Sequence, residues 1–296
     1  MSTPAMNSPP PTPPASSAGN PTPNARVRVI RLLAEHGLSP NTDLGQHFLA
    51  DENLVDLSLR EAHLRPDDVV LEVGAGVGVL TRALAGTVAW VHAVEIDRRL
   101  EPLLADVLGG QQNVTIHWDD AMRLALGALA PEPTALVSNL PYAIATPMVV
   151  ESTWQLPALR VWSVMVQREV ADRWLARPGD PSYGAPSVMI QLAAKPTFRR
   201  NVGREVFVPR PRVDSALVVL RRTGPGAAPA LRGLVRAAFA QRRKTLANNL
   251  AAQGFGRTDV AGVLEELGLP AAARPEHLAP DQFRLLAERV PWPTVS

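Results

Sequence analysis

One segment limits the possible folds more than any other. An apolar run, Asp67–Val73, leads directly into a glycine-rich turn, Gly74–Gly78, and a helical pattern with Leu80 and Leu84 follows at once. A buried strand, a glycine turn and a helix in immediate succession form the first unit of a doubly wound sheet. The sequence therefore predicts an α/β, Rossmann-like fold whose ligand lies at the carboxyl ends of the strands.

The spacing of the next acidic residue indicates which ligand this is. Glu95 stands twenty-one residues after Gly74, at the end of a second apolar run, Val88–Val94. An acid at this place can accept hydrogen bonds from both ribose hydroxyls of an adenosyl group. A dinucleotide-binding turn would have its third glycine at position 79, which is Val79. The pattern favours S-adenosylmethionine over NAD as the cofactor.

Two further strands are predicted to end in polar residues. Val114–His117 runs into Asp119-Asp120-Ala121, and Ala135–Val137 runs into Asn139. The Asp120 carboxylate can accept a hydrogen bond from the adenine amino group of the cofactor. Because the carboxyl ends of parallel strands share one edge of a sheet, these residues should converge with the glycine turn and Glu95 on a single crevice.

The segment Asn139-Leu140-Pro141-Tyr142 has a composition suited to holding an amino group on an aromatic ring. The side chain of Asn139 and the main chain of Leu140 each offer a carbonyl acceptor, and Pro141 stiffens the turn. The ring of Tyr142 can stack on the base that carries the amino group. Phe207 has two interpretations, a core residue or a second stacking face opposite Tyr142. The competing interpretation of the whole segment is an ordinary turn beside a packed tyrosine.

Composition excludes several classes of protein. The chain has no cysteine, so disulfides, thiolate metal sites and cysteine nucleophiles are absent. Its six histidines are scattered, and we predict no metal site. No apolar run approaches the ~18 residues of a membrane span, and we expect neither a secretory signal nor a membrane partner. We therefore expect a cytoplasmic protein.

Charge is concentrated in one part of the chain, although the formal net charge is only +2. Residues 201–250 hold nine arginines and one lysine against Glu205 and Asp214, a local excess of about +8. A basic block of this kind is typical of a surface that binds a polyanion such as RNA.

The chain divides into three predicted parts. Residues 1–24 contain eight prolines and almost no large apolar side chains, which predicts a disordered tail. Residues 25–223 form the predicted methyltransferase domain, and a Gly- and Pro-rich linker, Gly224–Pro229, follows it. Residues 224–296 form the predicted small all-helical, RNA-binding domain. Its helical patterns cover Leu231–Ala240, Arg242–Ala252, Val260–Leu267 and Pro280–Val290.

Taken together, these motifs resemble the ribosomal RNA adenine N6,N6-dimethyltransferases of the KsgA type, from about Gly45 to Arg289. Besides the segments already described, the resemblance rests on Gly45–Leu49, Gln167–Val170, Tyr183-Gly184, Phe207–Ser215 and Gln241–Thr245. One departure is Ala143, where relatives often carry Asn or His.

The resemblance implies transfer of methyl groups from S-adenosylmethionine to two adjacent adenines in the 3′-terminal hairpin of small-subunit ribosomal RNA, during small-subunit biogenesis. It assigns the cofactor site to His47, Leu49, Gly74, Gly76, Glu95, Asp120, Ala121 and Asn139. The catalytic group is Asn139, Leu140, Pro141, Tyr142 and Phe207, and the RNA-binding group is Arg242, Arg243 and Lys244. The expected partner is small-subunit ribosomal RNA or the immature small subunit, and the expected state is a monomer.

Three alternatives compete with this assignment. A methyltransferase of the macrolide-resistance type would act on large-subunit RNA. A ribosome-assembly or transcription factor would use the same fold without catalysis, although the intact Asn139–Tyr142 segment and Glu95 argue against it. An NAD oxidoreductase would show no affinity for RNA and ranks far behind the other two.

Overall fold

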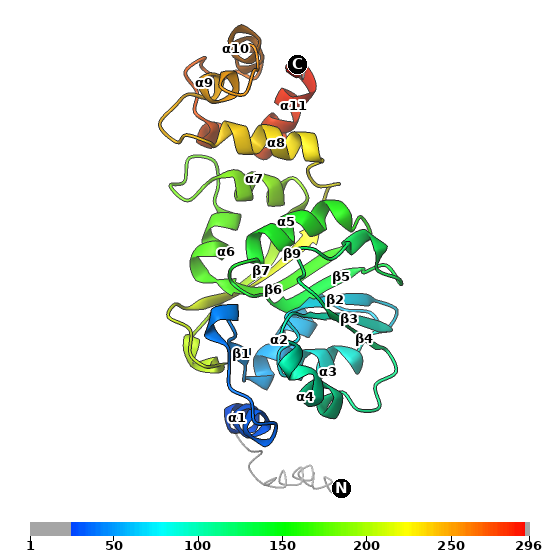
Figure 1. Cartoon of the computed structure of the whole chain (residues 1–296). Helices are drawn as coiled ribbons and strands as arrows, with labels where there is room; N and C mark the ends of the chain where they lie inside the picture. Colours follow the sequence, from blue (N-terminus) through cyan, green and yellow to red (C-terminus); the bar gives the residue numbers. More distant parts are fainter. Residues whose placement is uncertain (1–24, 294–296) are drawn as a thin grey trace, which may run out of the picture.

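Seven strands form one mixed sheet in the order β4-β3-β2-β5-β6-β9-β7. In the computed structural model, which describes residues 25–293, this sheet crosses the centre of the larger body (Figure 1). Its strands are β2 (Val69–Val73), β3 (Trp90–Glu95), β4 (Val114–Trp118), β5 (Ala135–Asn139), β6 (Val161–Gln167), β7 (Ala194–Val202) and β9 (Ser215–Arg222). A separate antiparallel pair joins β1 (Phe48–Leu49) to β8 (Phe207–Val208).

The five strands from β2 to β6 are parallel, whereas β9 and β7 are antiparallel to their neighbours. The chain proceeds outward from β2 through β3 to β4 and then returns to the other side of β2 with β5. This reversal of strand order creates the crevice in which open α/β sheets bind ligands. The predicted Rossmann-like fold is confirmed.

The two faces of the sheet bury separate sets of apolar side chains. Along β9, Leu217 and Val219 face one core, and Ala216, Val218 and Leu220 face the other. The alternation follows from the two-residue period of a strand. The first core includes α1 (Ala25–Glu35), α2 (Glu52–Ala62), α3 (Val79–Ala85) and α4 (Glu101–Val107). The second includes α5 (Ala145–Gln155), α6 (Arg168–Leu175) and α7 (Ala185–Gln191).

Four helices follow the linker, as the sequence pattern indicates: α8 (Pro229–Ala238), α9 (Leu246–Ala251), α10 (Arg257–Glu266) and α11 (Pro280–Arg289). Five short 3-10 turns complete the described elements: Thr42–Leu44, Arg98–Leu100, Leu126–Ala128, Arg204–Val206 and Pro275–His277. The predicted helix from Arg242 begins later than expected. Residues 241–245 form a turn, because Thr245 caps α9 by accepting a hydrogen bond from the Asn248 amide.

The helical region shares its core with the sheet instead of burying a separate one. Helix α7 lies between α5 and the C-terminal helices (Figure 1), and the buried side chains of α5, α7, α8 and α11 form one continuous cluster. The linker is fixed as well: the Gly224 amide donates to the carbonyl of Ala193, and the Arg222 guanidinium donates to four carbonyls, one of them that of Gly224. The predicted tail, residues 1–24, lies outside the described residues.

Strand β7 is one of the elements that the sequence analysis did not predict. It is an edge strand whose side chains are buried only at its two ends, Ala194 and Val202. Between them the strand is largely exposed and carries Lys195, Arg199 and Arg200. A strand that buries neither face lacks the apolar run or alternation by which strands are found in a sequence.

Candidate active site

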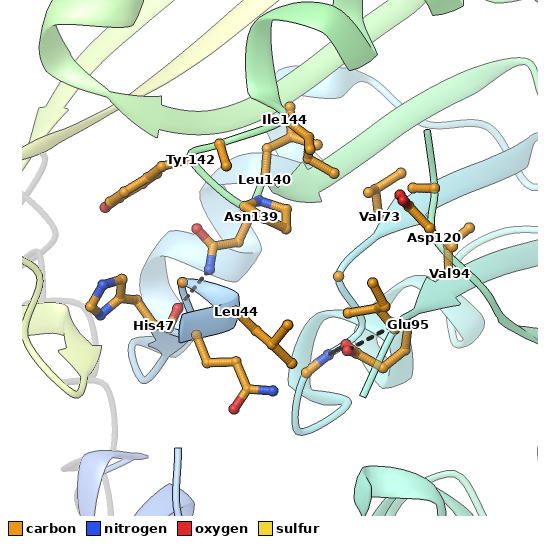
Figure 2. Close-up of a pocket in the computed structure, with 18 of the residues that line it drawn as sticks. Leu44, His47, Val73, Val94, Glu95, Asp120, Asn139, Leu140, Tyr142 and Ile144 are labelled. Carbon is orange, nitrogen blue, oxygen red and sulfur yellow. Dashed lines mark hydrogen bonds between the residues drawn. The ribbon is translucent and has the colours of Figure 1, made fainter. Parts of the chain in front are cut away.

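A cavity of about 280 Å³ opens at the carboxyl edge of the parallel strands. In Figure 2, Glu95 and Asp120 lie at one end of it, His47 and Tyr142 lie at the other, and Asn139 lies between them. Its walls come from the ends of β2, β3 and β5, the segment after β4, and residues 43–48 that precede and begin β1. The predicted residues that line this cavity are His47, Gly74, Gly76, Glu95, Asp120, Ala121, Asn139, Leu140, Pro141 and Tyr142. The predicted convergence is therefore present.

The glycine turn approaches its neighbours too closely to carry side chains. Gly74 and Gly76 have positive φ angles of 84° and 56°. A Cβ atom at Gly74 would lie 3.2 Å from the ring of Pro141, and one at Gly76 would lie 2.9 Å from the ring of Phe48. Glycine at both positions lets the backbone of the turn line the cavity directly.

Glu95 fixes the turn from the neighbouring strand. One carboxylate oxygen accepts a hydrogen bond from the Gly76 amide at 2.9 Å, and the other accepts from the amides of Ile96 and Asp97 at 3.0 and 2.9 Å. The side chain is buried, and burial raises the pKa of its carboxyl although these three donors oppose the shift. Glu95 therefore holds both the Gly76 amide and its own strand end in position at the cavity wall.

The second acid at this end of the cavity, Asp120, lies in the segment after β4. Asp120 caps its own turn by accepting a hydrogen bond from the Met122 amide at 2.9 Å. Next to Glu95 in the sequence, Ile96 is exposed over 52% of its surface and lines the cavity, and Leu44 lines it at 38% exposure. Large exposed apolar side chains beside carboxylates suit a flat ring with polar edges, such as an adenosyl group.

Asn139 is oriented by a residue far away in the sequence. Its side-chain nitrogen donates a hydrogen bond of 2.9 Å to the main-chain carbonyl of His47. Because a carbonyl only accepts, this bond identifies the nitrogen and leaves the amide oxygen available at the cavity (Figure 2). Within residues 25–293, neither this oxygen nor the main-chain carbonyl of Leu140 has a hydrogen-bond donor. The Asn139 amide oxygen and the Leu140 carbonyl are therefore both free to accept hydrogen bonds from one amino group.

Tyr142 and His47 form the aromatic end of the cavity. Their ring centroids are 5.8 Å apart with an interplanar angle of 32°. The Tyr142 hydroxyl shares a 2.8 Å hydrogen bond with the hydroxyl of Ser215, and burial raises the pKa of the phenol, which stays neutral. His47 Nδ1 lies 2.9 Å from the carbonyl of Pro209, so Nδ1 carries the proton and donates. Both rings are held by contacts at their edges.

Two of the residues predicted to bind the cofactor or the target base do not line the cavity. Phe207, the first residue of β8, has 0% exposure and packs in the core, and Leu49 of β1 is its register partner. This position corrects the expectation of a second stacking face, because no face of the ring is available to a base. Leu49 is buried and lines a small adjacent cavity shared with Gly74, Gly76 and Asn139.

A link that sequence reasoning missed joins the segment before β1 to the end of β3. The Gln46 side chain donates to the Asp97 carboxylate at 2.8 Å and accepts from the Asn41 amide at 2.7 Å. Asp97 also binds the Arg99 guanidinium at 2.6 Å, and that hydrogen bond is the main reason why the pKa of Asp97 is lowered. The only sequence signal for this link is the position of Asp97 two residues after Glu95.

The predicted RNA-binding residues lie elsewhere. Arg242, Arg243 and Lys244 occupy the exposed turn between α8 and α9 and do not line the cavity. The Arg242 guanidinium donates a 2.6 Å hydrogen bond to the carbonyl of Pro181, in the loop before α7. Their charge is therefore presented on the surface.

Two further properties concern the described part of the chain as a whole. Between residues 25 and 293, no group of three or more His, Asp or Glu side chains is placed to hold a metal ion. Over the same residues, no helix is both long and apolar enough to cross a membrane.

Comparison with known proteins shows similarity over most of the chain, beyond the motifs themselves. Residues 37–288 match the family Ribosomal RNA adenine dimethylase. The chain is 45% identical over 253 residues to Ribosomal RNA small subunit methyltransferase A of Rubrobacter xylanophilus, covering 85% of this chain and 95% of that protein. It is 42% identical to the protein of the same name from Thermobifida fusca, covering 89% and 94%.

Solved structures show the same relationship in three dimensions. A dimethyladenosine transferase from Plasmodium falciparum is similar with a TM-score of 0.69 and 26% identity, covering 81% of this chain and 96% of that one. The 23S rRNA methyltransferase ErmE is similar with a TM-score of 0.61 and 30% identity, covering 82% and 99%. With its sheet order, glycine turn and Asn139–Tyr142 segment in place, the chain belongs to the ribosomal RNA adenine dimethylase family of methyltransferases.

Proposed function

We propose that this protein transfers methyl groups from S-adenosylmethionine to N6 of two adjacent adenines in the 3′-terminal hairpin of small-subunit ribosomal RNA. The observation that carries the proposal is the pair of free acceptors, Asn139 Oδ1 and the Leu140 carbonyl, between an acidic end and an aromatic end of one cavity. The relatives from Rubrobacter xylanophilus and Thermobifida fusca, both named as small-subunit methyltransferases, support the choice of RNA.

The acidic end fits the cofactor. Glu95 lies where its carboxylate can accept from ribose hydroxyls, Asp120 where it can accept from an adenine amino group, and the exposed Ile96 offers an apolar face to the ring. The glycine turn supplies backbone without side chains at the same wall. The cofactor contributes a methyl group activated by a sulfonium. The protein's own part is to place the acceptor nitrogen in line with that group.

The aromatic end fits the target base. Adenine N6 is a weak nucleophile because its lone pair is delocalised into the ring. Acceptance of both N6 hydrogens by Asn139 Oδ1 and the Leu140 carbonyl draws the nitrogen toward a tetrahedral form and aims the lone pair at the methyl group. Tyr142, fixed by Ser215, stacks on the base that has left its helix. Catalysis then comes from positioning and preoriented dipoles. The methylated amine is acidic enough to lose its proton to water.

The two remaining candidates differ in acceptor or in chemistry. Action on large-subunit RNA is less well supported, because ErmE shares 30% identity with the chain whereas the two small-subunit enzymes share 45% and 42%. A non-catalytic assembly factor would need no free acceptors at the cavity. The orientation of Asn139 by the His47 carbonyl therefore favours catalysis.

A labelled-methyl assay tests the proposal. The protein is incubated with methyl-labelled S-adenosylmethionine and small or large ribosomal subunits from cells that lack this enzyme, and labelled adenines are mapped. We expect dimethyladenosine at two adjacent positions near the 3′ end of the small-subunit RNA only. Label in the large subunit would establish the macrolide-resistance type. Absence of label in both, with binding to small subunits retained, would establish the assembly factor.

A further inference from the structure

A second cavity, separate from the active-site cavity, opens beside the carboxyl end of β6. It has a volume of about 230 Å³ and is lined by Gln167, Arg168, Glu169, Arg204, Arg212, Val213 and Asp214. Three of these side chains are guanidinium groups and two are carboxylates. None of them belongs to the residues assigned above to the cofactor or to the target base.

The second cavity adjoins the residue that anchors the stacking tyrosine. Gln167 pairs with Ser215 in the β6–β9 ladder, and the Arg168 amide donates to the carbonyl of Asp214 at 3.0 Å. Ser215, next in sequence to Asp214, binds the Tyr142 hydroxyl. Strand β6 is also the parallel neighbour of β5, so Gln167 and Asn139 end adjacent strands on the same edge of the sheet. The two cavities are therefore neighbours on one edge.

The charges in the second cavity are only partly paired with one another. Arg168 and Asp214 are 3.6 Å apart, with side chains 51% and 42% exposed, so their pairing is loose. Arg204 donates to the main-chain carbonyl of Arg212 at 3.2 Å, and this neutral acceptor does not neutralise its positive charge. Within the described residues, the Arg212 guanidinium and the Glu169 carboxylate have no hydrogen-bond or ion-pair partner. The five charged groups sum to a net charge of +1.

These properties indicate a ligand that carries one negative charge and hydroxyl donors. Guanidinium groups recognise phosphate oxygens through paired donors, and a net charge of +1 matches a phosphodiester, which is a monoanion. A carboxylate such as Glu169 would repel a second phosphate but can accept from a ribose 2′-hydroxyl. Val213, 40% exposed at the cavity, offers an apolar contact to the sugar.

We infer that the second cavity binds the ribose and phosphate of the nucleotide next to the target adenine. The inference rests on the proposed function, since a base bound at Tyr142 must stay joined to its neighbours through the backbone. Holding that neighbour would fix the direction in which the RNA strand crosses the cavity edge. Phosphate contacts of this kind set register and orientation without reading the sequence.

The test combines one protein change with one RNA change. Arg212→Gln removes an exposed guanidinium that has no partner in the described residues, so the fold should be unaffected. The matched control is Arg82→Gln on α3, an exposed arginine that lines neither cavity. The RNA probe is a synthetic small-subunit 3′-terminal hairpin in which the phosphate on either side of the target adenines is replaced, one at a time, by an uncharged methylphosphonate. Dissociation constants are measured over a range of salt concentrations.

We expect Arg212→Gln to weaken binding roughly three- to tenfold and to reduce the log–log salt slope by about 0.7, with no such change for Arg82→Gln. One methylphosphonate should weaken wild-type binding by a similar factor and should not weaken the Arg212→Gln variant further, because both changes remove the same interaction. Equal losses of affinity in Arg212→Gln and Arg82→Gln, or additive losses for every methylphosphonate, would overturn the inference. Failure of the wild-type protein to methylate small subunits, with this coupling intact, would contradict only the proposed function.

Discussion

The active-site cavity and the basic turn at residues 241–245 hold their polar groups in opposite ways. At the cavity, Glu95 accepts three amide hydrogen bonds, Asn139 is oriented by the His47 carbonyl, and the hydroxyl of Tyr142 is bound to Ser215. In the turn, the charged side chains are exposed, and the contact that the structure gives to one of them is the bond from Arg242 to the Pro181 carbonyl.

This difference matches the two proposed tasks, catalysis at the cavity and RNA binding at the turn. A transition state gains only from dipoles that are already aimed, because reorienting them during the reaction costs free energy. A phosphate backbone is attracted by charge over a distance close to the Debye length, and exposed flexible arginines serve this purpose without fixed orientation. Changes in the cavity should therefore alter rates or cofactor affinity, and changes in the turn should alter the salt dependence of RNA binding.

The largest effect is expected for Asn139→Ala. The variant lacks the side-chain acceptor that we propose aims N6, so the single-turnover methylation rate should fall by roughly 10²–10³ while RNA affinity stays nearly unchanged. Mono- and dimethyl products should decline together, because both transfers need the same aimed lone pair. If Asn139 serves only to hold the His47 segment, the variant would melt at a lower temperature but methylate at a near-normal rate once folded.

A smaller effect on a different quantity is expected for Glu95→Ala. Removal of a charge-assisted hydrogen bond to the ribose should weaken S-adenosylmethionine binding by about 1.5–3 kcal/mol, measured by calorimetry. Glu95→Gln is a useful companion because its amide oxygen can keep the hydrogen bond to the Gly76 amide. RNA affinity measured without cofactor should be the same in all three proteins. Unchanged cofactor affinity in both variants would show that Glu95 holds only the glycine turn.

Changes in the basic turn should alter the salt dependence of RNA binding. Replacing Arg242, Arg243 and Lys244 by alanine should reduce the log–log salt slope of RNA binding by roughly 0.7–0.9 for each phosphate that the variant no longer neutralises. The methylation rate at saturating RNA should remain close to the wild-type value. A lower saturated rate with an unchanged slope would mean that the turn acts through its hydrogen bond to the Pro181 loop.

The smallest effect on activity is expected for a carboxyl buried behind the glycine turn, whose protonation should change the stability of the fold. Glu72 is 1% exposed, and burial raises the pKa of its carboxyl from 4.5 to about 8. The folded protein therefore binds this proton more tightly than the unfolded chain, so the stability contribution is lost as pH rises from about 4.5 to about 8.

Glu72→Gln resembles the protonated form and removes this pH dependence. Its melting temperature should match that of the wild-type protein near pH 5 and exceed it at pH 8 by roughly 2–4 °C for each kcal/mol of stability that the wild-type protein has lost. Thermal unfolding at the two pH values measures the difference. A constant offset between the two proteins at both values would show that Glu72 does not titrate in this range.

Much of the fold and of the site could be predicted from local patterns. The strand, glycine turn and helix after Asp67, the acid at Glu95 and the Asn139–Tyr142 segment are each defined by neighbouring residues, and parallel strands bring their carboxyl ends to one edge. Glycine at 74 and 76 is required by positive φ angles and close contacts, and the Gly-x-Gly motif shows this requirement in the sequence itself. The location of the cavity thus follows from the sequence.

The sequence by itself did not determine the contacts between distant residues. The orientation of Asn139 depends on His47, 92 positions earlier, and the anchoring of Tyr142 depends on Ser215, 73 positions later. Phe207 has the residue type of a stacking ring, but its pairing opposite Leu49 buries it in the core. Strand β7 carries no apolar pattern and exists because β9 offers it a ladder of hydrogen bonds. Local patterns reflect the burial of neighbouring residues, whereas these contacts form only after the chain has brought remote segments together.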